Sequence, residues 1–150
     1  NHSIHRDLVL NMSGTYEDRI KSCLKLNQAT PLYAIYRTTA LQKCMPYNDD
    51  PAYDLEELLK ILEFGNLNVI NEFLMHRSPI GESSKSLILH SLNNKSRISR
   101  IIFPYFSVTL FCLKKLGITF FLKNLFLFLR LNANGSYLIT LDFLKLIKNR

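Results

Sequence analysis

Apolar residues recur along most of this chain at intervals of three and four, the spacing of one face of an α-helix. Such runs predict helices over residues 16–26, 32–44, 55–64, 66–77, 118–131 and 137–150, with shorter runs between residues 85 and 117. Turn-forming residues separate the runs. We therefore expect seven or eight short helices arranged in pairs.

Polar residues and glycines mark where the first of these helices begin and end. Ser13 is expected to cap the helix over 16–26, and Asp54 with Glu57 is expected to form a capping box for the helix over 55–64. Gly65 stands where a left-handed C-terminal cap is wanted, and the next apolar run starts directly after it. Residues 58–77 are therefore predicted to form two antiparallel helices.

The C-terminal half contains two further breaks. Gly117 is expected to close one helix, and residues 132–136, Asn-Ala-Asn-Gly-Ser, are expected to form a turn before the last helix. The stretches 107–113 and 136–141 are rich in β-branched and aromatic residues, so a small sheet is the alternative there.

These elements predict an all-α fold in which short antiparallel helix pairs stack as an irregular α-solenoid. A length of 150 residues fits a single helical-repeat-like domain over 1–150, with a weak internal boundary near 78–84. The chain begins at Asn1 without a methionine and ends in an apolar-basic stretch. A fragment of a longer protein is therefore a second expectation.

The net charge of +7 is spread unevenly and points to two candidate contact patches. Residues 1–44 carry +3, residues 45–82 carry −6 and residues 83–150 carry +10. Such asymmetry is typical of two faces of one fold that attract each other, or of a surface that binds a charged partner. The candidate partner-binding residues are Asp49, Asp50 and Asp54 in the acidic segment and Lys95, Arg97 and Arg100 in the basic one.

Residues 101–131 are apolar enough to be tested as a membrane segment. Lys114 and Lys115 interrupt the run after thirteen residues, and Lys123 and Arg130 follow. A spanning helix needs about 20 mostly apolar residues, and a lysine at its centre costs roughly 2.5–3.5 kcal/mol. The run therefore favours burial between helices, with a membrane surface as the alternative contact of residues 101–131.

Residue patterns for catalysis or for cofactors are incomplete. Residues 5–11, His-Arg-Asp-Leu-Val-Leu-Asn, are similar to a kinase catalytic loop, but the asparagine comes one residue early and no Gly-rich phosphate loop occurs. The four histidines and three widely spaced cysteines lack metal-ligand spacing. We therefore predict no enzyme activity, no catalytic residue, no cofactor and no metal. Basic residues 95–100 beside aromatics permit nucleic-acid binding, which we disfavour.

One stretch resembles the inner and outer helix pair of an ankyrin repeat. The residues that carry the resemblance are Leu59, Leu62, Gly65, Leu67, Val69, Ile70, Phe73 and Leu74. Thr30, Pro31 and Leu32 are similar to the start of the family's Thr-Pro-Leu-His motif, with Tyr33 in place of histidine, and residues 131–141 are similar to its loop and next inner helix. The glycine spacings of 52 and 54 residues depart from the family's period of about 33.

The resemblance implies a degenerate ankyrin-type repeat that binds another protein. We therefore predict a non-enzymatic protein–protein interaction or scaffold module. The alternatives are a helical segment of a large trafficking or pump-assembly scaffold, and a protein associated with a membrane surface. The cysteine pattern favours a reducing compartment, so we expect an intracellular, cytoplasmic location with peripheral membrane association as an option.

Overall fold

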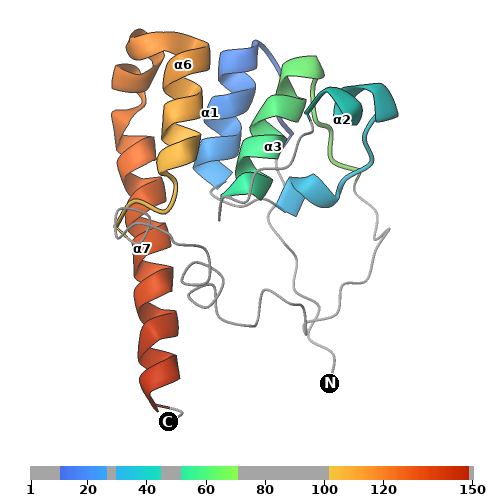
Figure 1. Ribbon diagram of the computed structural model, residues 1–150. Helices are drawn as coiled ribbons and strands as arrows, with labels where there is room; N and C mark the ends of the chain where they lie inside the picture. The colour runs from blue at the N-terminus through green and yellow to red at the C-terminus, as the bar shows by residue number, and fades with distance from the viewer. Residues whose placement is uncertain (1–10, 27–29, 45–51, 71–101, 149–150) are drawn as a thin grey trace. The chain divides into compact units, whose positions relative to one another are not determined.

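The computed structural model describes residues 11–26, 30–44, 52–70 and 102–148 (Figure 1). Within these ranges the chain forms helices and a single isolated β-bridge, which confirms the all-α prediction at this level. The elements are α1 (Tyr16–Leu26), η1 (Thr30–Tyr33), α2 (Thr38–Cys44), α3 (Tyr53–Ile61), η2 (Leu62–Phe64), α6 (Phe106–Lys123) and α7 (Leu125–Lys148), where η denotes a 3₁₀-helix.

The described residues fall into two compact units. Residues 11–44 and 53–70 make the first unit, and residues 102–148 belong to the second. The boundary predicted near 78–84 lies outside the described residues.

Helix α1 has the predicted bounds but a different cap. Its N-cap is Thr15, whose hydroxyl accepts a hydrogen bond from the Asp18 backbone N–H at 3.2 Å. The Asp18 carboxylate in turn accepts the Thr15 backbone N–H at 3.0 Å and the Thr15 hydroxyl at 2.6 Å. This reciprocal pair is a capping box with aspartate in the third helical position. The prediction that Ser13 caps this helix was therefore wrong.

Side chains of α1 satisfy backbone carbonyls at the end of α3 and in η2. The Arg19 guanidinium donates to the Leu62 carbonyl at 2.8 Å and to the Asn66 side-chain oxygen at 3.2 Å. The Tyr16 hydroxyl donates to the Leu59 carbonyl at 3.0 Å. The last carbonyls of a helix have no hydrogen-bond donor within the helix, so the side chains of α1 supply the missing donors. The core of this unit consists of residues that are almost fully buried, among them Met12, Ile20, Cys23, Leu58, Leu59 and Leu62.

The helix predicted over residues 32–44 is divided into two short pieces. Residues 30–33 form the 3₁₀-helix η1, residues 34–37 are irregular, and α2 starts only at Thr38. The Tyr36 hydroxyl donates to the Pro31 carbonyl, which folds this irregular segment back on η1. Ile35 and Tyr36, which lie at the break, have lower helix propensity than alanine, leucine or lysine.

The predicted helical hairpin over residues 58–77 does not form at its turn. Gly65 has φ 163° and ψ −177°, which is extended backbone rather than the left-handed cap that we predicted. Leu67 then exchanges two backbone hydrogen bonds with Met12, at 2.8 and 2.9 Å, and the Val69 N–H donates to the Asn11 side chain at 2.7 Å. Residues 66–70 are therefore not helical, and Leu67 pairs with Met12 in an isolated β-bridge. Residues 71–77 lie outside the described residues.

In the second unit, α6 and α7 form an antiparallel pair, which we call the hairpin (Figure 1). Residues 102–105, directly before α6, are the start of the hairpin. Helix α6 breaks at Gly117, whose φ of 81° and ψ of 172° are not helical and favour glycine, as its sequence position predicted. Asn124 ends α6, and its carbonyl accepts the Leu127 N–H at 2.9 Å at the start of α7. The strands considered at 107–113 and 136–141 are helical.

Helix α7 runs without interruption through residues 132–136, where we predicted a turn. The Asn132 side chain accepts the Tyr105 N–H at 3.1 Å and donates to the Phe128 carbonyl at 3.0 Å. The Ser136 hydroxyl lies 2.7 Å from the Ile102 carbonyl and 3.0 Å from the Asn132 carbonyl. These polar side chains therefore bond along the helix and to the start of the hairpin, so tertiary contacts override their turn preference.

Replacing Thr15 tests the cap of α1. We expect Thr15→Ala to lower the free energy of unfolding by about 1 kcal/mol, because it removes the hydroxyl that accepts the Asp18 N–H. Ser13→Ala is the matched control and should leave stability unchanged. Urea unfolding followed by circular dichroism measures both, and equal effects of the two variants would contradict the assignment of the cap.

The same cap makes a pH-dependent contribution to stability. The hydrogen bonds from the Thr15 side chain and backbone hold the pKa of Asp18 below its ordinary value of 3.8. Because the folded pKa is the lower one, this contribution is present above pH 3.8 and is lost as the pH falls through the folded pKa. We expect the stability difference between wild type and Asp18→Asn to shrink between about pH 6 and about pH 2.5 in urea titrations. A difference that grows toward acid would reject this sign.

Gly135 tests how closely α7 approaches the start of the hairpin. A Cβ atom at this position would lie 2.5 Å from Pro104 Cγ and 2.6 Å from Tyr105 Cε2. Overpacking of this kind costs about 1–3 kcal/mol, whereas the better helix propensity of alanine returns at most about 1 kcal/mol. We therefore expect Gly135→Ala to destabilise the chain in urea unfolding. A stabilised variant would show that the two segments are not in contact.

Candidate functional site

Five of the six residues predicted to bind a partner lie outside the described residues. They are Asp49, Asp50, Lys95, Arg97 and Arg100. The acidic and basic patches therefore stay predictions.

Asp54, the sixth residue, is the second residue of α3 and accepts the Leu55 N–H at 2.7 Å. Partial burial raises its pKa against the opposing effect of backbone hydrogen bonds. It is not an N-cap, and the Glu57 Oε1 atom is buried without a hydrogen-bond partner among the described residues. The predicted capping box was therefore wrong, because α3 begins before Asp54.

Helix α7 provides a different candidate surface. The buried face of the helix shows which side is directed toward the core. Phe128 and Leu131 are almost completely buried, and Asn124 and Gly135 are buried with them. Phe128, Leu131 and Gly135 follow one another at intervals of three and four, so they form one seam along α7, and Asn124 lies directly before the helix. Phe121 of α6 stacks on Phe128 with ring centroids 5.2 Å apart.

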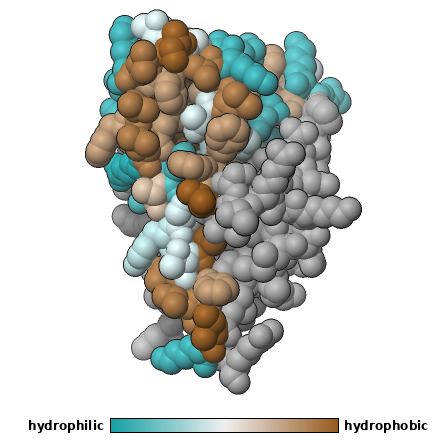
Figure 2. Space-filling view, turned by 60° about the vertical axis from the view of Figure 1, so that its left-hand side comes forward, coloured by the Kyte–Doolittle hydropathy of each residue, from teal (hydrophilic) through white to brown (hydrophobic). Residues whose placement is uncertain are grey.

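The opposite side of α7 carries a second row of residues that remains exposed. We call this row the outward stripe; it consists of Phe126, Leu129, Ala133, Tyr137, Thr140, Leu144 and Ile147. All seven are exposed, with relative exposures of 75% for Phe126, 57% for Leu129, 63% for Tyr137 and 57% for Ile147. Figure 2 shows hydrophobic residues on this part of the molecule, toward both ends of α7. Water therefore contacts large apolar side chains toward both ends of α7, and the smaller or more polar Ala133, Tyr137 and Thr140 lie between them.

The part of α7 beyond the hairpin contact is the most exposed. Ser136 is bonded to the carbonyl of Ile102, at the start of the hairpin, and α7 continues past it for twelve residues, about 18 Å at 1.5 Å per residue. Tyr137, Leu138, Phe143, Leu144 and Ile147 of this extension are all exposed. Rows of exposed apolar residues are normally covered by a partner, so the outward-stripe residues of this extension are suited to being covered.

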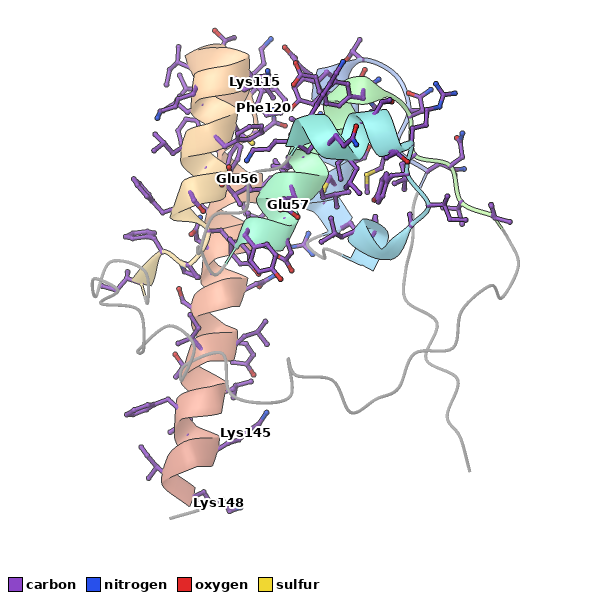
Figure 3. All side chains as sticks on the ribbon, turned by 45° about the vertical axis from the view of Figure 1, so that its right-hand side comes forward. Glu56, Glu57, Lys115, Phe120, Lys145 and Lys148 are labelled. Carbon is purple, nitrogen blue, oxygen red and sulfur yellow. The ribbon has the colours of Figure 1, made fainter. Side chains whose placement is uncertain are left out.

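Positive charge borders the outward stripe. Arg130 and Lys148 lie 18 residues apart, which is five helical turns, so both project from the same side of α7 next to the stripe. Lys145 and Lys148 occupy the last turns of the helix (Figure 3). Over residues 102–148 the sequence has six Lys and Arg residues and one acid, Asp142. The surface therefore combines apolar contact area with a positive potential.

The first unit offers a smaller contact surface. A groove of about 370 Å³ lies between residues 35–40 and residues 61–67. Ile35 at its edge is 90% exposed, and the Lys43 ammonium lies 5.5 Å from the centroid of the Phe64 ring. Burial raises the pKa of Tyr36 to about 12, so this hydroxyl stays protonated at neutral pH. The groove thus presents both apolar and polar side chains, the latter including Arg37 and Asn66.

Reactive and metal-binding groups do not converge in the part of the chain that the structure describes. Cys23, Cys44 and Cys112 are buried and form no disulfide, and burial raises the pKa of the Cys44 thiol. No three His, Cys, Asp or Glu side chains among the described residues are placed to share a metal ion. Within the described ranges, none of the helices combines the length and the apolar character needed to cross a bilayer.

The sequence did not lead us to predict the outward stripe, because we expected a turn within it. The expected turn at 132–136 divided α7 into two helices, and each half alone shows too few apolar positions. A usable signal was present, since residues 126, 129, 133, 137, 140, 144 and 147 keep a spacing of three or four through the polar stretch.

Comparison with protein-family models, with curated proteins and with solved structures gives no match, so the candidate site rests on the chain's own geometry.

Proposed function

We propose that this chain is a non-enzymatic module that binds another protein through the outward stripe of α7. The observation that carries the proposal is the exposed row from Phe126 to Ile147, in which Phe126, Leu129, Leu144 and Ile147 are large and apolar. Soluble proteins rarely leave large contiguous apolar patches in water, and such patches mark interaction surfaces.

The proposal includes the predicted repeat architecture. The α6–α7 pair buries one face of α7 and leaves the opposite face open, as an interior unit of a helical repeat does toward its neighbour. Further helix pairs of ankyrin type, stacked as an irregular solenoid, would use the same principle. The three cysteines form no disulfide, which supports the proposal of an intracellular location.

Contact with a membrane surface is the second candidate function. Ile118, Leu122 and Phe126 are strongly exposed around the turn between α6 and α7, and Lys123 and Arg130 stand near them in the sequence. Apolar and cationic residues in this combination are typical of helices that lie on anionic bilayers. This candidate uses the region 101–131 that the sequence indicated.

Substitutions in the outward stripe separate these functions from a purely structural role. We expect the double variant Leu129→Gln, Leu144→Gln to bind the protein partner at least about 100-fold more weakly, because each buried leucine contributes about 1.5–3 kcal/mol. The measurement is retention of a partner on the immobilised chain, followed by calorimetric titration. Leu138→Gln is the matched control, because Leu138 is exposed on another side of α7.

Two outcomes would contradict the proposal. One is equal retention of the partner by wild type and by the double variant, with unchanged helical circular dichroism. The other is flotation of the wild-type chain with vesicles of phosphatidylcholine and phosphatidylserine while no protein is retained. The second result would establish the membrane-surface candidate instead.

A further inference from the structure

The spacing of the outward stripe indicates the shape of its occupant. From Phe126 to Ile147 the stripe advances 21 residues in six steps of three or four, a mean of 3.5 residues. A repeat of 3.5 is the spacing at which one α-helix packs lengthwise against another. The stripe extends for about six turns, or about 32 Å at 1.5 Å per residue.

The alternation of large and small residues supports the same occupant. Ala133 and Thr140 stand between the larger Leu129, Tyr137 and Leu144, and all five are exposed. Small positions between large ones form the holes into which the side chains of a facing helix insert. A lipid surface responds to total apolar area and has no use for this period, so the pattern favours a helix over a bilayer.

Charge defines the chemistry that the facing helix must carry. Arg130 and Lys148 border the stripe on one side, and Lys145 lies in the last turns of the same helix (Figure 3). Charged residues that flank an apolar seam select the partner by complementarity. Carboxylates on the flank of the incoming helix would pair with Arg130 and Lys148.

A second copy of this chain is a poorer fit. Pairing two α7 helices would bring together Arg130, Lys145 and Lys148 from each copy, against a single acid, Asp142, in each. Like charges along a helix interface are destabilising, and the effect accumulates over several pairs.

We propose that the outward stripe receives one amphipathic α-helix of another protein, about six turns long, with glutamate or aspartate residues flanking its apolar seam. The inference rests on the proposed function and specifies the partner for the same surface. It follows from three features of α7 together, namely the 3.5-residue period, the small residues at Ala133 and Thr140, and the cations beside the stripe.

The test uses two synthetic peptides of three heptads, which match the six turns of the stripe, with leucine and isoleucine in the seam. One carries glutamate at the flanking positions and the other carries lysine. Fluorescence anisotropy with the full chain should show binding of the glutamate peptide and at least tenfold weaker binding of the lysine peptide. Leu129→Gln should weaken binding of the glutamate peptide at least tenfold, whereas Leu138→Gln should leave it unchanged.

Charge reversal provides a second, independent readout. The double variant Arg130→Glu, Lys148→Glu should reverse the preference, so that the lysine peptide binds more tightly than the glutamate peptide. The double variant Lys114→Glu, Lys123→Glu on α6 is the control for net charge, because it reverses two charges at exposed residues of the other helix. It should retain the wild-type preference. These exposed substitutions should leave the helical circular dichroism signal intact.

Several results would overturn the inference. They are equal binding of both peptides, loss of binding in Leu138→Gln as large as in Leu129→Gln, a dimer in sedimentation that disappears in Leu129→Gln, and binding of phosphatidylserine vesicles without binding of either peptide. If a partner is retained through the stripe but the glutamate peptide does not compete, the inference fails and the proposed function stands. If no partner depends on the stripe, the proposed function itself fails.

Discussion

The continuity of α7 depends on a small set of polar bonds at the start of the hairpin. Asn132 and Ser136 engage the Tyr105 N–H and the Ile102 carbonyl, while Gly135 lets the helix approach Pro104 and Tyr105 closely. If these residues formed the turn that their types favour, α7 would be two short helices with separate directions. The outward stripe exists as one surface because the hairpin contact keeps the middle of α7 helical.

A few polar contacts also hold the first unit together. Its helices are short, and isolated helices of 7 to 11 residues are marginal in water. Arg19 and Tyr16 of α1 compensate carbonyls at the end of α3 and in η2, and the bridge between Met12 and Leu67 joins the segments that flank them. Tertiary contacts of side chains therefore stabilise elements that would not persist alone.

The two candidate functions of α7 follow from one energetic problem. Its inner seam buries Phe128 and Leu131, but a helix with apolar residues around most of its circumference needs a second cover. The first unit shows the ordinary solution, in which apolar residues are enclosed by neighbouring helices. On α7 the outer residues stay in water, and the acidic helix that we propose as their cover fits their 3.5-residue period and the cations beside it.

Local pattern by itself determined that the described chain is helical, where α1 begins and ends, and that Gly117 interrupts a helix. These features depend on residue spacing and on the conformational freedom of glycine, which act within a few residues. Only the tertiary structure decided that residues 132–136 are helical and that residues 66–70 are not. In both cases distant partners outweigh local preference: Tyr105 and Ile102 for residues 132–136, and Met12 for residues 66–70. A pattern of apolar positions cannot identify such partners, because they come from elsewhere along the chain.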